Sequence, residues 1–127
     1  MNKIADLKEK AKIGWASFIS FEALTSTAAP KLVEFASVSK GMRLLDVACG
    51  TGVVALTASR IGAQVEGIDL TPELISRANE NSKIMGLEAK FIEGDAEFLP
   101  YKEQEFLKTI RELQKMSDRD LADIGLS

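Results

Sequence analysis

The fold is decided by residues 43–52, which read Arg43-Leu44-Leu45-Asp46-Val47-Ala48-Cys49-Gly50-Thr51-Gly52. A short apolar run ends at a carboxylate, and a loop that contains two glycines follows it directly. The run predicts a buried strand over residues 43–47. Residues 53–61 then carry a helical pattern that stops at Gly62. The stretch and its continuation therefore predict a strand, a tight glycine loop and a helix, in that order.

The same order of elements repeats further along the chain. Strands are predicted at residues 64–68 and 90–93, and a helix is predicted between them. Thr71 as N-cap and Pro72 in the first turn mark the start of that helix, and Gly86 marks its end. This alternation predicts an α/β fold with a parallel sheet of three or four strands and right-handed crossovers.

Three segments follow from these patterns. Residues 1–41 form a predicted N-terminal helical segment, residues 42–102 an α/β half-domain, and residues 103–127 a predicted helical tail. In the first segment, apolar residues recur at three- and four-residue steps up to Trp15 and Phe18, as one face of a helix requires. Core packing is the favoured interpretation of these two aromatic residues. A lid over a small-molecule site is the alternative.

Composition excludes several classes of protein. The chain has 127 residues, enough for one domain, and its net charge of −3 argues against a general nucleic-acid binder. It contains no histidine, which removes the commonest general base and most metal sites, so no metal is predicted. Its single cysteine, Cys49, cannot form an internal disulfide. No signal peptide or run of about 18 apolar residues occurs, so we expect no membrane span and a cytoplasmic location.

Each predicted strand terminates at an aspartate, namely Asp46, Asp69 or Asp95. Right-handed crossovers bring the carboxyl ends of parallel strands to one edge of the sheet, where ligands of such folds bind. Three carboxylates gathered there repel one another unless a ligand, hydrogen-bond donors or water compensates them. A cationic or hydroxyl-rich ligand suits such a site, and a polyphosphate does not.

The glycine loop leaves a second interpretation open. Residues 50–55 formally match the dinucleotide fingerprint G-x-G-x-x-(G/A), and Asp69 lies 17 residues after Gly52. Binding of a nicotinamide dinucleotide is therefore an alternative. Asp46 argues against it, because its charge would face a pyrophosphate. The chain also has no G-K-(S/T) sequence, so it has no P-loop.

Three motifs in this order resemble those of class I S-adenosylmethionine-dependent methyltransferases. Residues 44–52 are similar to the first motif of that family, residues 65–74 to the second, and residues 93–100 to the third. The nearest group is the small-molecule enzymes of the quinone-biosynthesis type. One departure is Ala48, where many members have glycine. The resemblance implies a partial Rossmann-like methyltransferase fold over about residues 42–102.

The resemblance also implies a role for each matched position. The methionyl end of the cofactor would lie against Asp46 and the glycine loop, and Asp69 would accept hydrogen bonds from the ribose hydroxyls. Leu70 would pack against the adenine, while Asp95 and the backbone amide of Ala96 would bind its edge. The implied cofactor-binding residues are Asp46, Ala48, Gly50, Thr51, Gly52, Asp69, Leu70, Asp95 and Ala96.

In function, the resemblance implies in-line methyl transfer from S-adenosylmethionine to a small-molecule acceptor. Such a displacement depends mainly on positioning, so the absence of histidine does not forbid it. No residue stands out as a catalytic base, and Cys49 is interpreted as a small loop residue rather than a nucleophile. A catalytically incomplete cofactor-binding or interaction module is the alternative function.

The resemblance stops after about residue 102. Members of the family continue with four more strands, whereas this chain continues with a charged stretch of helical pattern. Its last residues resemble the end of a short bacterial domain of poorly understood role, so a truncation, a fusion or a frameshift is expected.

The lost strands would leave the edge of the strand at 43–47 unpaired. Three structures could cover this edge: a fourth strand at residues 106–110, the tail helices, or a second protomer. We therefore expect a homo-oligomer or a partner chain at this edge.

Overall fold

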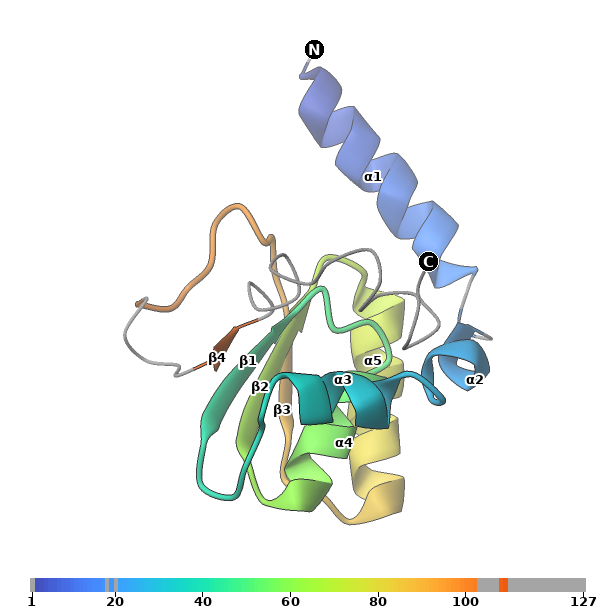
Figure 1. Ribbon diagram of the computed structural model, residues 1–127. Coiled ribbons are helices and arrows are strands. Elements are labelled where there is room, and N and C mark those ends of the chain that lie inside the picture. The colour runs from blue at the N-terminus through green and yellow to red at the C-terminus, as the bar shows by residue number, and fades with distance from the viewer. Residues whose placement is uncertain (1, 18, 20, 103–107, 110–127) are drawn as a thin grey trace.

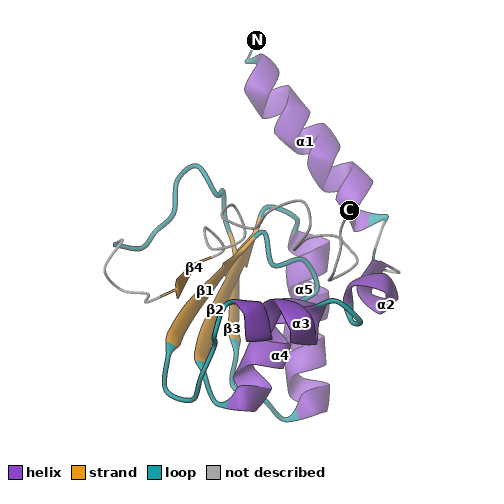
Figure 2. Ribbon diagram, in the orientation of Figure 1, coloured by secondary structure: helices purple, strands orange, loops and turns teal. Residues whose placement is uncertain are grey.

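A four-stranded parallel sheet forms the centre of the protein in the computed structural model, which describes residues 2–17, 19, 21–102 and 108–109. The strand order is β3-β2-β1-β4 (Figures 1 and 2). The strands are β1 (Arg43–Val47), β2 (Gln64–Asp69), β3 (Lys90–Glu93) and β4 (Lys108–Thr109). All three pairings are parallel, so the predicted α/β class and the count of three or four strands are confirmed.

Five helices accompany the sheet in the described part of the chain. They are α1 (Lys3–Ala16), α2 (Phe21–Thr25), α3 (Ala29–Phe35), α4 (Val53–Ile61) and α5 (Pro72–Met85). The helices α3, α4 and α5 lie on one side of the sheet (Figure 2). Both α4 and α5 end at a left-handed glycine, as predicted. None of the helices among these residues is long and apolar enough to cross a membrane.

One detail of the α5 start differs from its prediction. Thr71 occupies the N-cap position, but its side chain makes no capping hydrogen bond. Its backbone N–H instead donates to the Asp69 carboxylate at 2.9 Å, and the residue is almost fully buried. The sequence pattern located the helix start because Pro72 fits the first turn, while tertiary contacts decided what Thr71 does.

Both faces of the sheet are covered, but by different kinds of structure. On the helix side, Phe91 of β3 packs with residues of α3, α4 and α5 in the main core. On the other side, Leu45 and Ile68 pack with Leu99 and Tyr101, which belong to the loop after β3. A loop therefore shields the face that lacks a helix layer in the described residues.

Close packing explains a glycine in the middle of β2. A Cβ atom on Gly67 would lie 2.6 Å from the Phe91 ring and 2.9 Å from the Cys49 sulfur. Neither neighbour is the free end of a flexible side chain, because Phe91 and Cys49 are both buried. The backbone of β2 can approach β3 and the glycine loop this closely only without a side chain.

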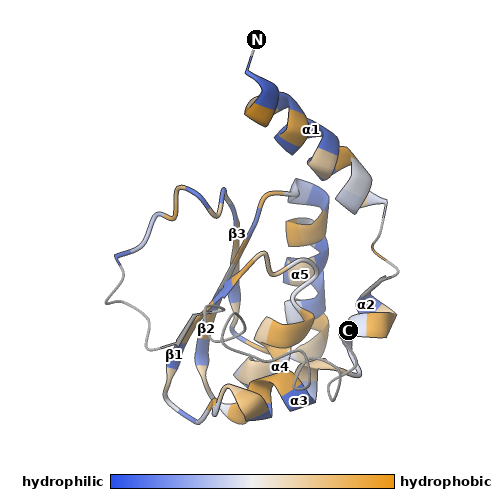
Figure 3. Ribbon diagram, turned by 45° about the horizontal axis from the view of Figure 1, so that its top comes forward, coloured by the Kyte–Doolittle hydropathy of each residue, from blue (hydrophilic) through white to orange (hydrophobic). Residues whose placement is uncertain are grey.

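The core-packing interpretation of Trp15 is wrong. This side chain is 56% exposed, and α1 has no buried residues at all. The helix projects from the body of the molecule and carries alternating apolar and polar residues (Figure 3). Its apolar periodicity is real, but the described residues do not enclose it. Phe18, the other residue of that prediction, lies outside the described residues.

The strand β4 is one of the three coverings predicted for the β1 edge. Lys108 and Thr109 pair in parallel with Leu44 and Leu45. The helical pattern predicted for the tail is wrong at these two residues, and the rest of the tail lies outside the described residues. Pairing with β1 overrides local helix propensity because it satisfies backbone groups that would otherwise be exposed at a sheet edge.

Candidate functional site

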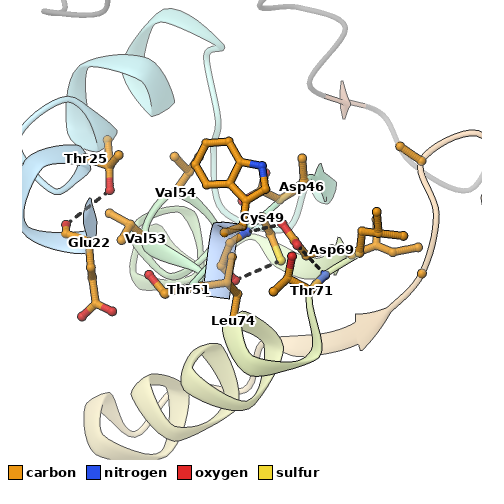
Figure 4. Close-up of a pocket in the computed structure, with 18 of the residues that line it drawn as sticks. Glu22, Thr25, Asp46, Cys49, Thr51, Val53, Val54, Asp69, Thr71 and Leu74 are labelled. Carbon is orange, nitrogen blue, oxygen red and sulfur yellow. Dashed lines mark hydrogen bonds between the residues drawn. The ribbon is translucent and has the colours of Figure 1, made fainter. Parts of the chain in front are cut away.

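A pocket of about 610 Å³ lies beyond the carboxyl ends of β1, β2 and β3. Its lining comes from the glycine loop, from the ends of the strands and from α1, α2, α3, α4 and α5, and Figure 4 shows part of it. Its size is typical of small-molecule sites. Of the predicted site residues, those that line it are Asp46, Ala48, Gly50, Thr51, Asp69, Leu70, Asp95 and Ala96. Asp46, Asp69 and Asp95 therefore share one hollow.

Asp69 organises the glycine loop. Its Oδ2 atom accepts a hydrogen bond from the Gly50 N–H at 2.8 Å, and Oδ1 accepts one from the Thr71 N–H at 2.9 Å. An ionised carboxylate has about four acceptor positions, so each oxygen keeps one for a ligand. The side chain thus ties the loop after β1 to the end of β2 and still offers two acceptors to the pocket.

Asp46 is the most deeply buried of the three aspartates. It is 4% exposed, and its Oδ2 atom has no hydrogen-bond partner among the described residues. Burial raises the pKa of this carboxyl to about 7, an effect that the Ala55 N–H opposes and the charge of Asp69 reinforces. A buried acceptor without a donor is costly, so this oxygen is suited to a ligand that brings a positive charge or an N–H group.

Asp95 already has a cationic partner. The ammonium of Lys8, on α1, pairs with its Oδ2 atom and also lies 3.1 Å from the Glu97 carboxylate. The Glu97 N–H donates to Oδ1 of Asp95 at 3.0 Å. Lys8 is the main reason that the pKa of Asp95 is lowered from its usual range. This carboxylate is therefore ionised at neutral pH and faces the pocket in a paired state.

Gly52 is the one predicted site residue that does not line the pocket. It has φ +84°, and a Cβ atom on it would lie 2.8 Å from the Phe91 ring. Both features require glycine, since a side chain would be strained and would clash with a buried ring. Gly52 lets α4 begin against β3, and its place in the motif reflects packing rather than pocket lining.

Ala48 holds a backbone conformation that suits glycine better. Its φ is +60°, in the left-handed region that costs other residues roughly 1–2 kcal/mol. We expect Ala48→Gly to raise the free energy of unfolding by up to about 1 kcal/mol, because the relief of strain exceeds the added entropy of the unfolded chain. Urea denaturation measures this change. Ala89→Gly, at a loop residue without positive φ, should instead lower stability.

Sequence reasoning missed a polar cluster that joins the N-terminal segment to the body. The Asn81 amide donates to the Glu22 carboxylate and to the Thr51 carbonyl oxygen, both at 3.1 Å. The Arg77 Nε atom donates to the same Glu22 oxygen at 3.3 Å. Asn81 thereby links α2 and the glycine loop through α5. Charged and polar residues on a helix usually face solvent, so no sequence pattern marks this cluster or Lys8.

The lining of the pocket is acidic. Its described residues include four carboxylates, Glu22, Asp46, Asp69 and Asp95, and neither lysine nor arginine. Burial, with the charges of Asp46 and Asp69, raises the pKa of the Cys49 thiol, so it is not activated as a thiolate. The rest of the lining consists largely of small and aliphatic residues, together with the aromatic Trp15. Lys8 pairs with Asp95 and Arg77 with Glu22, so the lining offers carboxylate acceptors to cationic and hydroxyl groups and no lysine or arginine to a phosphate.

Comparisons with known proteins agree with this geometry. A family model described as "Methyltransferase domain" matches residues 44–124. An uncharacterised protein of Mycobacterium bovis is 42% identical over 85 residues, which are 67% of this chain and 31% of that protein. A solved putative methyltransferase from Bacillus halodurans is 29% identical, with a TM-score of 0.57, over 61% of this chain and 34% of that one.

A second solved structure with this fold is named as a cyclase rather than as a methyltransferase. The 4+2 cyclase SpnF is 33% identical, with a TM-score of 0.58, over 69% of this chain and 32% of that one. The chain spans about a third of the length of the uncharacterised Mycobacterium bovis relatives that it matches. The matched part contains the glycine loop and all three pocket aspartates.

Proposed function

Because this chain belongs to the methyltransferase-domain family, of the class I S-adenosylmethionine-dependent type, we propose that its pocket binds S-adenosylmethionine for methyl transfer to a small-molecule acceptor. The observation that carries the proposal is the lining of the pocket: four carboxylates and no cationic side chain among the described residues. S-adenosylmethionine carries a sulfonium and an ammonium group, two ribose hydroxyls and no phosphate. Its charges and donors therefore match this lining.

The residues present fit the cofactor group by group. Asp46, whose buried Oδ2 atom has no hydrogen-bond partner in the described part of the chain, is suited to the cationic methionyl end. Asp69 keeps two acceptor positions for the ribose hydroxyls, and Leu70 lies beside it in the lining to pack against the base. Asp95 and the Ala96 backbone amide are suited to the edge of the adenine. In this assignment Gly50 and Thr51 form the floor under the methionyl end.

We assign the acceptor side of the pocket to the lining residues that have no proposed contact with the cofactor. It consists mainly of apolar side chains, including Trp15, Leu32 and Val54. The bound cofactor supplies an activated methyl group, and the protein would contribute alignment of the acceptor with that group and exclusion of water. A small apolar acceptor suits such a surface, and the small-molecule class of acceptor belongs to this proposal.

Calorimetric titration tests the proposal directly. We expect S-adenosylmethionine and S-adenosylhomocysteine to bind and to raise the melting temperature, because each ligand binds the folded state only. NAD serves as the matched control, since the glycine loop formally fits its fingerprint. NAD should give no heat and no thermal shift, because its pyrophosphate would face Asp46. Binding of NAD without binding of S-adenosylmethionine would contradict the proposal and favour a dinucleotide site.

A catalytically incomplete binding module is the second candidate. One observation favours it: the chain covers about a third of the length of its relatives. The solved cyclase of the same fold is itself named as an enzyme, so it bears only on which reaction the fold carries. A fold carries different reactions according to its site residues. Binding of S-adenosylmethionine without turnover of any acceptor would support the module. Methyl transfer by the isolated chain would support the enzyme.

The β1 edge bears on the same question. Among the described residues, the strand β4 pairs with Leu44 and Leu45 of the five β1 residues. We propose that a second copy or a partner chain covers the β1 backbone groups that the described residues leave unpaired, as unpaired edges favour association. The proposed homo-oligomer or partner chain would complete the sheet and supply further acceptor contacts.

A further inference from the structure

We propose that Lys8 is a latch that holds α1 across the pocket and controls how fast ligand enters and leaves it. The latch consists of Lys8 on α1 and the Asp95, Glu97 and Phe98 side chains of the loop after β3. The ammonium pairs with both carboxylates and lies 5.5 Å from the centre of the Phe98 ring. The inference about ligand exchange rests on the proposed function, whereas the latch itself does not.

The latch contains the ion pairs that join α1 to the body of the protein among the described residues, and the charge of Lys12 on α1 also lowers the pKa of Asp95. Among the described residues, the other ion pairs of α1 stay within the helix: Lys10 with Asp6, and Lys12 with Glu9. Lys8 instead reaches residues almost ninety positions away in sequence, and only about a quarter of its side chain is exposed. The helix α1 has no buried residue and contacts α5, and the pairing of Lys8 with the loop after β3 adds to the restraint on its position.

The latch and the pocket lining lie on the same face of α1. Ala11 and Trp15 both line the pocket, and they follow Lys8 at steps of three and seven residues, which place all three on one helix face. A latched Lys8 therefore fixes Ala11 and Trp15 as part of the pocket wall. Release of Lys8 would free this wall to swing away from the site.

The latched state leaves room for a ligand. The pocket of about 610 Å³ is present while Lys8 is paired, and Asp95 lines it in that state. The carboxylate of Asp95 also keeps acceptor positions beyond those used by Lys8 and the Glu97 N–H. The latch is therefore compatible with occupancy, so it acts as a closure over bound ligand rather than as a competitor that blocks it.

Lys8→Met tests the latch, because methionine keeps an unbranched side chain of nearly the same length and removes the charge. Trp15 is the single tryptophan of the chain, so its fluorescence reports on this wall of the pocket. In the ligand-free protein we expect Lys8→Met to increase acrylamide quenching of Trp15. High salt should do the same to the unsubstituted protein and nothing further to the variant. Lys10→Met is the matched control, since it loses only a pair within α1.

The second measurement is the dissociation rate of S-adenosylhomocysteine, followed by stopped-flow Trp15 fluorescence. We expect Lys8→Met to raise this rate by about five-fold, the size expected for loss of two partly exposed ion pairs and a cation–π contact. Glu97→Gln should raise it less, and adding it to Lys8→Met should change nothing more. Glu97 has no proposed contact with the cofactor, so this variant leaves the binding residues intact.

The outcomes separate the latch from the proposed function. Equal quenching and equal rates in Lys8→Met and Lys10→Met would overturn the latch. Increased quenching with an unchanged dissociation rate would show that α1 is held by Lys8 but does not control exchange, which also overturns the proposal as stated. Absence of any S-adenosylhomocysteine binding would overturn the proposed function, while the quenching measurement would still decide whether Lys8 holds α1.

Discussion

Replacing Asp69 by alanine is expected to lower the affinity for S-adenosylmethionine by about 100-fold or more. The substitution removes two acceptors that the pocket offers to the ribose hydroxyls. Hydrogen bonds to a charged group contribute about 1.5–3 kcal/mol each, and two of them account for a loss of this size. The substitution also releases the N–H groups of Gly50 and Thr71, so the glycine loop loses its anchor to β2. Titration calorimetry measures the change.

Two further variants make this test specific. Asp69→Asn keeps the shape of the side chain, but an amide offers an acceptor to only one of the two N–H groups, so affinity should again fall strongly. Glu93→Ala is the matched control: Glu93 pairs in register with Asp69 on β3, is exposed and does not line the pocket. It should bind normally. Equal affinity in Asp69→Ala and Glu93→Ala would remove Asp69 from the proposed site.

Asp46→Asn is expected to stabilise the ligand-free protein and to weaken ligand binding. The folded-state pKa of Asp46 is about 7, above the ordinary value of 3.8. The folded protein therefore holds a proton between these two pH values that the unfolded chain has already lost. Stability falls as pH rises from about 4 to about 7, and the full cost of the buried charge applies above that range. Asparagine carries no such cost.

The pH dependence provides the measurement. The gain in unfolding free energy of Asp46→Asn over the unsubstituted protein should grow by on the order of 2–3 kcal/mol between pH 5 and pH 8. Urea denaturation of both proteins at each pH gives this difference, in which all other titrating groups cancel. A difference independent of pH would show that Asp46 ionises with an ordinary pKa.

Ligand binding should respond in the opposite direction. A cationic ligand favours the ionised form of Asp46, so the affinity of the unsubstituted protein for S-adenosylmethionine should rise as pH rises through about 7. In Asp46→Asn this dependence on pH should vanish. The affinity at pH 8 should fall by about ten-fold or more, as expected for the loss of one charge-assisted hydrogen bond. Stability and binding would then be opposed at one side chain, as is common at functional sites.

Much of the fold could be predicted because its signals are local. The strands at 43–47 and 90–93 and the helix at 53–61 lie where their patterns predicted them, since apolar period and flanking glycines determine such elements directly. That the three aspartates meet could also be predicted, because parallel strands with right-handed crossovers align their carboxyl ends at one edge. This part of the candidate site required only the order of the elements.

Other features depend on contacts between distant segments. The exposure of Trp15 could not be predicted, because an amphipathic period does not tell whether a partner surface covers it. The strand at 108–109 contradicts its own helical pattern, since pairing with β1 supplies hydrogen bonds that local propensity cannot represent. The contact of Lys8 with Asp95 joins positions almost ninety residues apart, and no sequence spacing marks it.

The amino-acid sequence by itself determined the α/β order, the glycine loop and the presence of carboxylates at the strand ends. These depend on short-range patterns and on the handedness of the chain. Only the tertiary structure decided the state of each carboxylate. Asp46 is buried with one oxygen that no described residue contacts by a hydrogen bond, Asp69 accepts from two backbone N–H groups, and Asp95 is paired with Lys8. The physical reason is that charge and hydrogen bonding depend on burial and on neighbours in space, which distant parts of the chain supply.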